Sequence, residues 1–236
     1  MIAIFRTFVF GFTALGLASC DSADRPAPGV ESSQTPVVSI ASSVDSAAPA
    51  GPPRRVVIQG TDLTGIGYDV GSPDAKVVVV NFSDFGCPFC GTFARETYPA
   101  LEREFVEPGK VFFKYVPFVM GMFPNAREAS RAAECAADQG RFWEMHDRLY
   151  AGQPAWKRTF APEEIFRQDA AAIQLDLARF NACYAGQQTD RRTAEATRRA
   201  EQLRVRATPS FFVNGRLIEG ALPLEQFRML LNEVTR

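Results

Sequence analysis

Cys87 and Cys90, separated by two residues, are the side chains of this sequence whose type and spacing could do chemistry. They follow a short valine-rich run at 76–82 and open a stretch with helical spacing. A thiol at a helix N-terminus faces unpaired backbone amides and the positive end of the helix dipole, which favour its thiolate. The spacing therefore predicts thiol–disulfide exchange, in which Cys87 attacks and Cys90 resolves the mixed disulfide.

The same pair could instead supply half of a zinc site. Such sites use four ligands, but the sequence has no second pair of this kind and only one histidine, His146. His146 shares a helical stripe with Phe142, Met145 and Leu149 and is predicted to lie in the core. No resident metal or cofactor is therefore predicted. Because soft thiolates also suit Cu(I), a non-catalytic metal-binding lipoprotein is the second hypothesis.

The elements that must position these cysteines have the pattern of an α/β fold. In chain order we expect a strand at 55–58, a Gly- and Asp-rich turn region to Asp74, a buried strand at 76–82, a helix at 91–105 and a strand at 111–117. Two strands joined through a helix need a crossover, so the strands at 76–82 and 111–117 should be parallel. The helix would turn four apolar side chains to one side: Phe93, Tyr98, Leu101 and Phe105.

The second half of the chain is helical before it returns to strands. Residues 124–202 are rich in alanine and predict about four amphipathic helices broken by glycine and proline. Strands at 209–213 and 216–218 flank Asn214-Gly215, a tight-turn signal, and a helix at 223–234 closes the chain. The expected order is β-α-β, a helical insertion, then β-β-α.

Three segments of the sequence resemble the DsbA-like thiol–disulfide oxidoreductases of the thioredoxin superfamily. They are 80–90, which contains both cysteines, 141–150 and 207–215. The resemblance implies a thioredoxin-like fold over 56–236, with its halves at 56–120 and 203–236 and an all-helical domain inserted at 121–202.

The resemblance also implies roles for residues around the cysteines. Thr208-Pro209 would carry a cis peptide bond beside them, and the Thr208 backbone would pair with the substrate chain. Pro88 and Phe89, together with Thr208 and Pro209, would shape the surface that binds peptides.

Two positions depart from the pattern of that family. Phe89 stands where strongly oxidising members have histidine, so we expect a less oxidising pair. Asn81 stands where the family commonly has a buried acid that moves the proton of the resolving thiol. Because an amide cannot move that proton, we expect mixed disulfides to be released more slowly. Asp84 is near in sequence, and Lys114 matches a family lysine without its usual acidic companion. Asn81, Asp84 and Lys114 form the expected proton-transfer neighbourhood.

Cys135 and Cys183 both lie in the helical insertion. In an exported protein, two cysteines outside the redox pair are expected to form a structural disulfide. The alternative is two buried free thiols that pack as small hydrophobic side chains.

The N-terminal residues have the pattern of a targeting segment followed by a flexible tether. Residues 1–19 predict a lipoprotein-type signal peptide, after which Cys20 would be lipidated; the alternative is an ordinary signal peptide with an incidental cysteine. Residues 20–55 are rich in Ser, Ala and Pro and predict a disordered tether. The expected location is the periplasmic side of a bacterial envelope, with Asp21 favouring the inner membrane.

Composition limits the remaining functions. The chain has 236 residues, 26 Lys+Arg and 27 Asp+Glu, a formal net charge of −1, which argues against a nucleic-acid partner. We therefore expect an envelope thiol–disulfide oxidoreductase that exchanges disulfides with exported proteins, with disulfide formation favoured and a reductase or isomerase as the alternative. Its partners would be cysteine-containing envelope proteins and a membrane redox partner, either a quinone-linked oxidase or a thiol reductase.

Overall fold

The computed structural model describes residues 53–186 and 188–236. The predicted signal peptide, Cys20 and the predicted tether up to residue 52 lie outside these residues. Within the described ranges, no helix is long and apolar enough to cross a bilayer.

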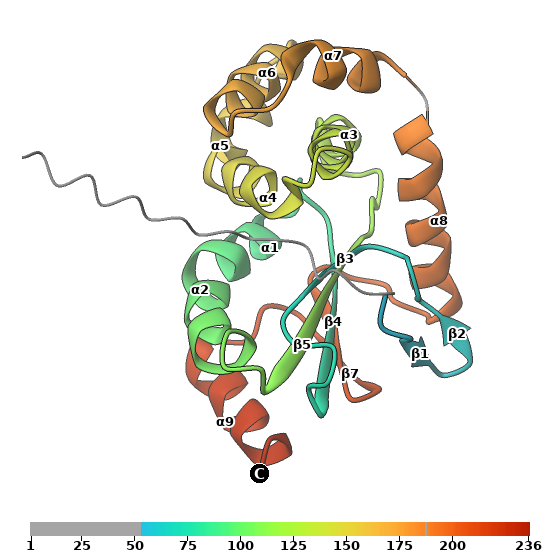
Figure 1. Ribbon diagram of the computed structural model, residues 1–236, viewed down its shortest axis with the longest axis vertical. Helices are drawn as coiled ribbons and strands as arrows, with labels where there is room; N and C mark the ends of the chain where they lie inside the picture. Colours follow the sequence, from blue (N-terminus) through green and yellow to red (C-terminus); the bar gives the residue numbers. More distant parts are fainter. Residues whose placement is uncertain (1–52, 187) are drawn as a thin grey trace, which may run out of the picture. The chain divides into compact units, whose positions relative to one another are not determined.

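The central sheet has five strands in the order β3-β5-β4-β6-β7 (Figure 1). β4 (Val77–Ser83) and β5 (Val111–Pro117) are parallel, as the crossover predicts. β6 (Ser210–Val213) pairs antiparallel with the other edge of β4 and forms a hairpin with β7 (Arg216–Glu219). This confirms the predicted thioredoxin-like arrangement of β-α-β and β-β-α halves around a helical insertion.

The predicted first strand is present, but it is shorter than expected and lies outside the central sheet. β1 (Val57–Ile58) pairs with β2 (Thr61–Asp62) in a separate two-stranded sheet, whereas β3 (Tyr68–Val70), inside the expected turn region, is the antiparallel neighbour of β5. Val56 and Ile58 bury against one face of the central sheet, which accounts for the apolar character of this segment.

One long helical segment follows Cys87. α1 (Pro88–Thr92) continues through a π-helical turn (Phe93–Thr97) into α2 (Tyr98–Leu101) and a second π-helical turn (Glu102–Val106). Phe93 and Tyr98 are five residues apart, and the wider π-helical turn between them keeps both on the buried side. The predicted apolar stripe is therefore confirmed, although the helix is not a regular α-helix.

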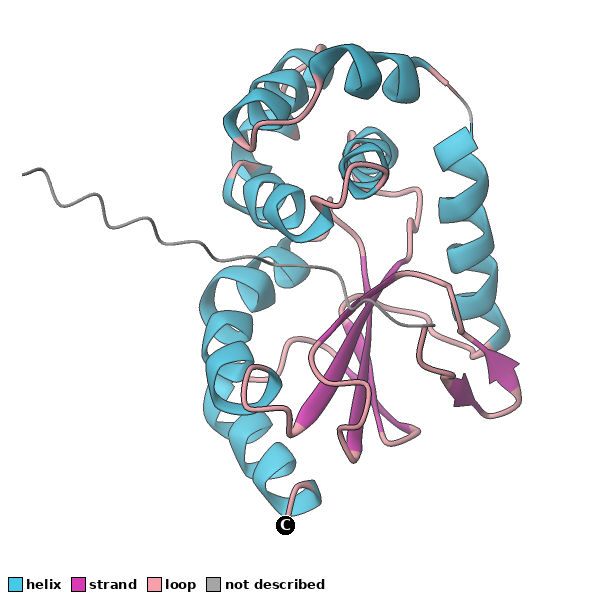
Figure 2. Ribbon diagram, viewed as in Figure 1, coloured by secondary structure: helices cyan, strands magenta, loops and turns pink. Residues whose placement is uncertain are grey.

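Helices cover both faces of the sheet (Figure 2). On one face, Val79, Phe113 and Phe211 pack in a core with residues of α2 and α9 (Leu224–Val234). On the other face, Phe82 and Phe112 share a core with Ala196 and Ala200 of α8 (Gln188–Gln202). α8 falls within the range expected for the insertion, but its apolar side covers the sheet.

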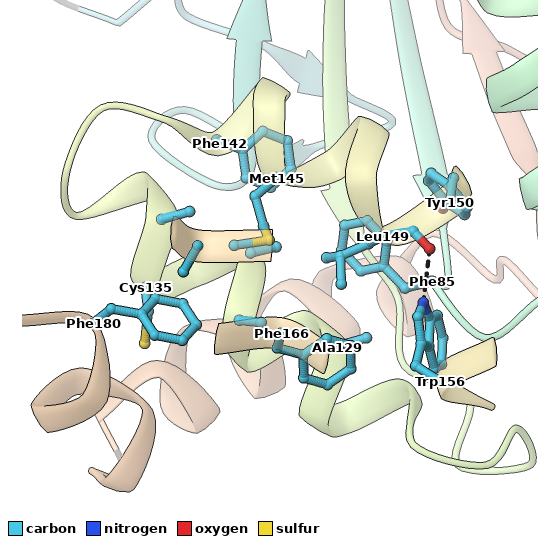
Figure 3. Close-up of a cluster of buried hydrophobic side chains, with 14 of the residues drawn as sticks. Phe85, Ala129, Cys135, Phe142, Met145, Leu149, Tyr150, Trp156, Phe166 and Phe180 are labelled. Carbon is cyan, nitrogen blue, oxygen red and sulfur yellow. Dashed lines mark hydrogen bonds between the residues drawn. The ribbon is translucent and has the colours of Figure 1, made fainter. Parts of the chain in front are cut away.

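The insertion contains more helices than expected, because glycine and proline divide it further. They are α3 (Ala126–Ala137), α4 (Phe142–Ala151), α5 (Gln153–Trp156), α6 (Pro162–Ala172), α7 (Leu177–Ala185) and α8. Their core includes Met145, Trp156 and Phe166, and it extends to Phe85 in the loop before α1 (Figure 3). Cys135 of α3 and Cys183 of α7 are joined by a disulfide with Cα atoms 5.7 Å apart.

Candidate active site

The two redox cysteines lie where β4 gives way to α1. Cys87 is the N-cap residue of α1 and Cys90 lies in its first turn, and both are free thiols. Cys87 is 2% exposed and Cys90 is fully buried, whereas Phe89 between them is 67% exposed. The helix start thus holds the two sulfurs inside the protein and turns the intervening dipeptide outward.

The two thiols have opposite acidities. The pKa of Cys87 is lowered to about 6, first by a hydrogen bond from the Cys90 thiol and further by the Thr208 side chain and by backbone amides of α1, against the effect of burial. The pKa of Cys90 is raised well above its usual value by burial and by the neighbouring Cys87. At neutral pH the arrangement therefore gives one thiolate and one thiol, which is the division that the predicted attacking and resolving roles require.

The loop before β6 completes one side of the site. The Thr208–Pro209 peptide bond is cis, the isomer that the resemblance implied. The Cys87 thiol donates to the Thr208 carbonyl oxygen at 3.2 Å, and the Thr208 hydroxyl donates to the Met120 sulfur at 3.6 Å. The structure thus brings Thr208 to Cys87 as expected, and it adds Met120, which carried no signal in the sequence.

Asp84 lies beside Cys87 and is buried. Its carboxylate accepts hydrogen bonds from the Gly86 amide at 2.8 Å and the Met120 amide at 2.9 Å. Burial raises the pKa of Asp84 to about 6 against these hydrogen bonds, and negative charge on Cys87 raises it further. Asp84 is therefore a titratable neighbour of the attacking cysteine.

Asn81 and Lys114 do not lie together. In the parallel register Lys114 pairs with Val80 and Asn81 pairs with Tyr115, so the two side chains project from opposite faces of the sheet. Lys114 points to the α8 side, away from the α2 side on which Asn81 lies. The expected proton-transfer neighbourhood therefore does not form as one cluster.

Lys114 also has an acidic companion, contrary to expectation. Its ammonium lies 2.6 Å from an Asp69 carboxylate oxygen and donates to the Ile66 carbonyl at 2.9 Å. Asp69 is directly opposite Lys114 in the antiparallel register of β3 and β5. The sequence did not reveal this pair because β3 itself was read as a turn.

Helix α5 of the insertion holds the backbone of the active-site loop. The Gln153 amide donates to the carbonyls of Phe85 and Cys87, and the Lys157 ammonium donates to the Gly86 carbonyl. Gly91 makes room for this contact, since a Cβ atom there would lie 2.6 Å from the Gln153 side-chain oxygen. A glycine directly after Cys90 was the signal in the sequence that a close neighbour approaches.

Three buried hydroxyls form a cluster, and two of them belong to Tyr115 and Tyr150, which share a core with Cys90. Ser83 Oγ is 2.9 Å from Tyr150 Oη, which is 3.2 Å from Tyr115 Oη. Tyr115 also donates to the Ser83 carbonyl at 3.4 Å. None of these residues was predicted to belong to the site, because they come from β4, β5 and α4 and meet only in the folded chain.

His146 is buried among the rings of Phe85, Tyr115 and Tyr150, which confirms its predicted core position. Its Nδ1 atom lies 2.9 Å from an Asp147 carboxylate oxygen. Across the residues that the structure describes, no group of three or more His, Cys, Asp or Glu side chains is placed to hold a metal ion.

Comparisons with known proteins place the chain in a family. The family model described as thioredoxin matches residues 64–233. The Na⁺/H⁺ antiporter NhaA 3 of Salinispora tropica is 37% identical over 157 residues, which are 66% of this chain and 22% of that protein. The probable disulfide bond formation protein D of Bacillus anthracis is 30% identical over 152 residues, 63% of this chain and 70% of that protein.

The fold is also found among solved structures. The crystal structure of oxidised BdbD from Bacillus subtilis matches with a TM-score of 0.67 and 22% identity, over 77% of this chain and 98% of that one. The chain spans 22% of the antiporter's length and 70% of the length of protein D. Because the family model covers most of the described residues and protein D is 30% identical over 70% of its length, the chain belongs to the thioredoxin family and is similar to disulfide bond formation protein D.

Proposed function

We propose that the chain is a thiol–disulfide oxidoreductase of the bacterial cell envelope that forms disulfides in exported proteins. The observation that carries this proposal is the contrast between Cys87, whose pKa is lowered to about 6, and the buried Cys90, whose pKa is raised. A thiolate that can attack and a buried thiol that can close the disulfide are the two parts that exchange needs. The likeness to disulfide bond formation protein D supports the same activity.

The acidity of Cys87 argues for an oxidant, and its neighbour Phe89 argues for a mild one. A stabilised thiolate favours the reduced form of the pair, so a lower pKa makes its disulfide more oxidising. The pKa of Cys87 is lowered to about 6, which is a shift in that direction. The Phe89 ring cannot donate a hydrogen bond to the thiolate, so the thiolate lacks one further source of stabilisation.

A redox titration of the Cys87–Cys90 pair against glutathione tests the direction. We expect a potential between about −270 mV and about −120 mV, the thioredoxin and DsbA values, together with oxidation of a dithiol peptide.

Two variants test the roles of the residues at the site. Phe89→His, at an exposed position, should raise the potential, and Cys87→Ala should abolish exchange. A potential of about −270 mV or lower would make the chain a reductase. Cu(I) binding by a protein that fails to exchange disulfides would favour the metal-binding hypothesis.

We propose further that Cys20 carries a lipid that tethers the domain to the periplasmic face of the inner membrane. The support is the pattern of residues 1–20. In host cells the full chain should fractionate with membranes, and Cys20→Ala should release it to the soluble fraction. A membrane-bound Cys20→Ala chain would contradict this anchor.

The proposed partners are cysteine-containing envelope proteins and a membrane redox partner, a quinone-linked oxidase for disulfide formation. Cys90→Ser should trap these proteins as mixed disulfides on Cys87, because the resolving thiolate is missing. Cys87→Ser with Cys90 intact is the matched control and should trap none. A Cys90→Ser trap that stays empty would contradict exchange with proteins.

A further inference from the structure

The inference concerns how Cys90 acts as a thiolate although it is buried, and it rests on the proposed exchange activity. Cys90 must carry negative charge when it attacks the mixed disulfide on Cys87 and when it leaves in the reverse step. A fully buried thiolate is costly unless donors reach it. Asn81 occupies the place of the family's buried acid, and an amide cannot take up or release a proton at neutral pH.

The hydroxyl cluster offers donors at the required place. Cys90 shares one buried cluster with Tyr115 and Tyr150, and the Ser83 side chain lowers the pKa of the Cys90 thiol against the effect of burial. Tyr150 lies behind Ser83 at 2.9 Å, and Tyr115 lies behind Tyr150 at 3.2 Å. All three side chains belong to buried residues, so water does not compete for their hydrogen bonds.

Asp84 is less suited to this role. Both of its carboxylate oxygens already accept backbone hydrogen bonds, from the amides of Gly86 and Met120. The contact of Asp84 with Cys90 is a backbone hydrogen bond rather than a carboxylate contact. The carboxylate is therefore engaged by the Gly86 and Met120 amides, whereas the hydroxyls of Tyr115 and Tyr150 belong to residues that share a buried cluster with Cys90.

We propose that Ser83, Tyr150 and Tyr115 form a hydroxyl relay that stabilises the Cys90 thiolate during thiol–disulfide exchange. In this proposal Ser83 donates to the reacting sulfur and is therefore a catalytic residue, whereas Tyr150 and Tyr115 position and polarise its hydroxyl. Each hydroxyl carries one proton and can rotate. When Cys90 becomes negative, Tyr115 donates to Tyr150, Tyr150 to Ser83, and Ser83 to the sulfur.

When Cys90 is neutral, the same hydroxyls have other acceptors. Tyr115 can donate to the Ser83 carbonyl at 3.4 Å, and Tyr150 to the Asp84 carbonyl at 3.5 Å. The relay therefore has one arrangement for each charge state of the sulfur. No buried hydroxyl loses its partner in either arrangement, which avoids the cost of an unpaired polar group.

The step that the relay supports is balanced within the proposed reaction. The Cys90 thiolate supplies the electron pair that forms the Cys87–Cys90 disulfide, and the bond between Cys87 and the substrate sulfur breaks. The substrate leaves as a thiolate that takes up one proton, which matches the proton lost by Cys90. The titratable groups around Cys90 are Cys87, Asp84, Tyr115 and Tyr150, and His146 packs edge-to-face against the two tyrosines.

The test measures closure of a mixed disulfide that needs no protein substrate. Reduced protein is mixed with oxidised glutathione, and the first-order release of the second glutathione is followed from about pH 6 to pH 9 by rapid acid quench. We expect closure at neutral pH to slow about tenfold in Ser83→Ala and about fivefold in Tyr150→Phe, because the pKa of Cys90 rises when donors are removed. The deficit should shrink as the pH approaches that pKa.

Two further variants separate a relay from simple packing. Tyr98→Phe removes another buried tyrosine hydroxyl, one that donates to Glu102 at 3.3 Å, and should leave closure unchanged. Ser83→Ala combined with Tyr150→Phe should be no slower than Ser83→Ala alone, since Tyr150 acts through Ser83. Equal closure rates in Ser83→Ala, Tyr150→Phe and Tyr98→Phe would overturn the relay.

A titration of the Cys90 ¹³Cβ signal by NMR keeps this proposal distinct from the proposed function. Its midpoint should rise by about one pH unit in Tyr150→Phe and stay in place in Tyr98→Phe. If that shift appears but the parent protein fails to oxidise a dithiol peptide, the relay stands and the proposed function falls. If peptides are oxidised but the midpoint does not move, only the relay falls.

Discussion

The charge on Cys87 depends on its partner more than on any other group. A hydrogen bond from the Cys90 thiol is the largest cause of the lowered pKa of Cys87, ahead of the Thr208 side chain and the backbone amides of α1. A thiolate accepts such a bond and a thiol does not need it, so the bond favours the charged form. The nucleophile and the resolving residue are thus linked before any substrate arrives.

Replacing Cys90 should therefore change the pH dependence of Cys87. In the parent, alkylation by iodoacetamide should accelerate as the pH rises through about 6, where the thiol becomes thiolate. In Cys90→Ala that rise should move upward by about one pH unit, because the donor is gone. Cys90→Ser keeps a hydroxyl donor and should lie nearer to the parent. Equal midpoints in Cys90→Ala and the parent would show that the helix N-terminus, not Cys90, sets the acidity.

At the scale of elements, the insertion is part of the active site. α4 supplies Tyr150 and α5 supplies Gln153, which binds two carbonyls of the loop that carries Cys87. β4 and α1 place the cysteines. The helices of the insertion hold the loop that joins β4 to α1 in its conformation.

Removing the α5 contact should loosen this loop. Gln153→Ala leaves the Phe85 and Cys87 carbonyls without their side-chain donor, which should lower the free energy of unfolding by about 1–3 kcal/mol. Gln168→Ala, an exposed glutamine of α6 that pairs with Glu164, is the matched control and should change stability by about 0.5 kcal/mol or less. Urea unfolding measures both, and equal midpoints would mean that the loop does not depend on α5.

The sequence predicts elements whose signals are local. β4, β5 and the Asn214-Gly215 hairpin have strong signals in their own residues, and they lie where expected. β3 was missed because Tyr68–Val70 is only 3 residues long and lies between glycines, so its pairing with β5 depends on the rest of the sheet. The Ser83 and Tyr150 contact was out of reach for the same reason, since 67 residues separate them.

At the scale of the molecule, one core joins the insertion to the redox pair. Phe85, Cys87, Cys90 and Tyr115 share a cluster of buried residues with the helices of the insertion, and Figure 3 shows Phe85 among the side chains of those helices. The insertion should therefore not unfold without disturbing the cysteines, and the described residues should unfold as one cooperative unit.

Removing the disulfide between Cys135 and Cys183 tests whether the insertion and the active site unfold together. The bond closes a loop of 48 residues, and the chain-entropy model gives up to about 4 kcal/mol for its loss. We expect Cys135→Ala with Cys183→Ala to lower the urea midpoint equally for two probes. Tryptophan fluorescence reports the insertion, and alkylation of the buried Cys90 reports the active site. Midpoints that separate would show that the insertion unfolds on its own.

The outward turn of Pro88 and Phe89 has a consequence for how such a protein can diversify. From Asn81 to Cys90 these two are the exposed residues, and every other side chain in that stretch is buried. Gly86 cannot accept a side chain, because a Cβ atom there would lie 2.4 Å from Phe123. Mutation can therefore alter the outer surface of the redox centre at 88 and 89 without repacking the interior, so chemical tuning and structural integrity are inherited through separate positions.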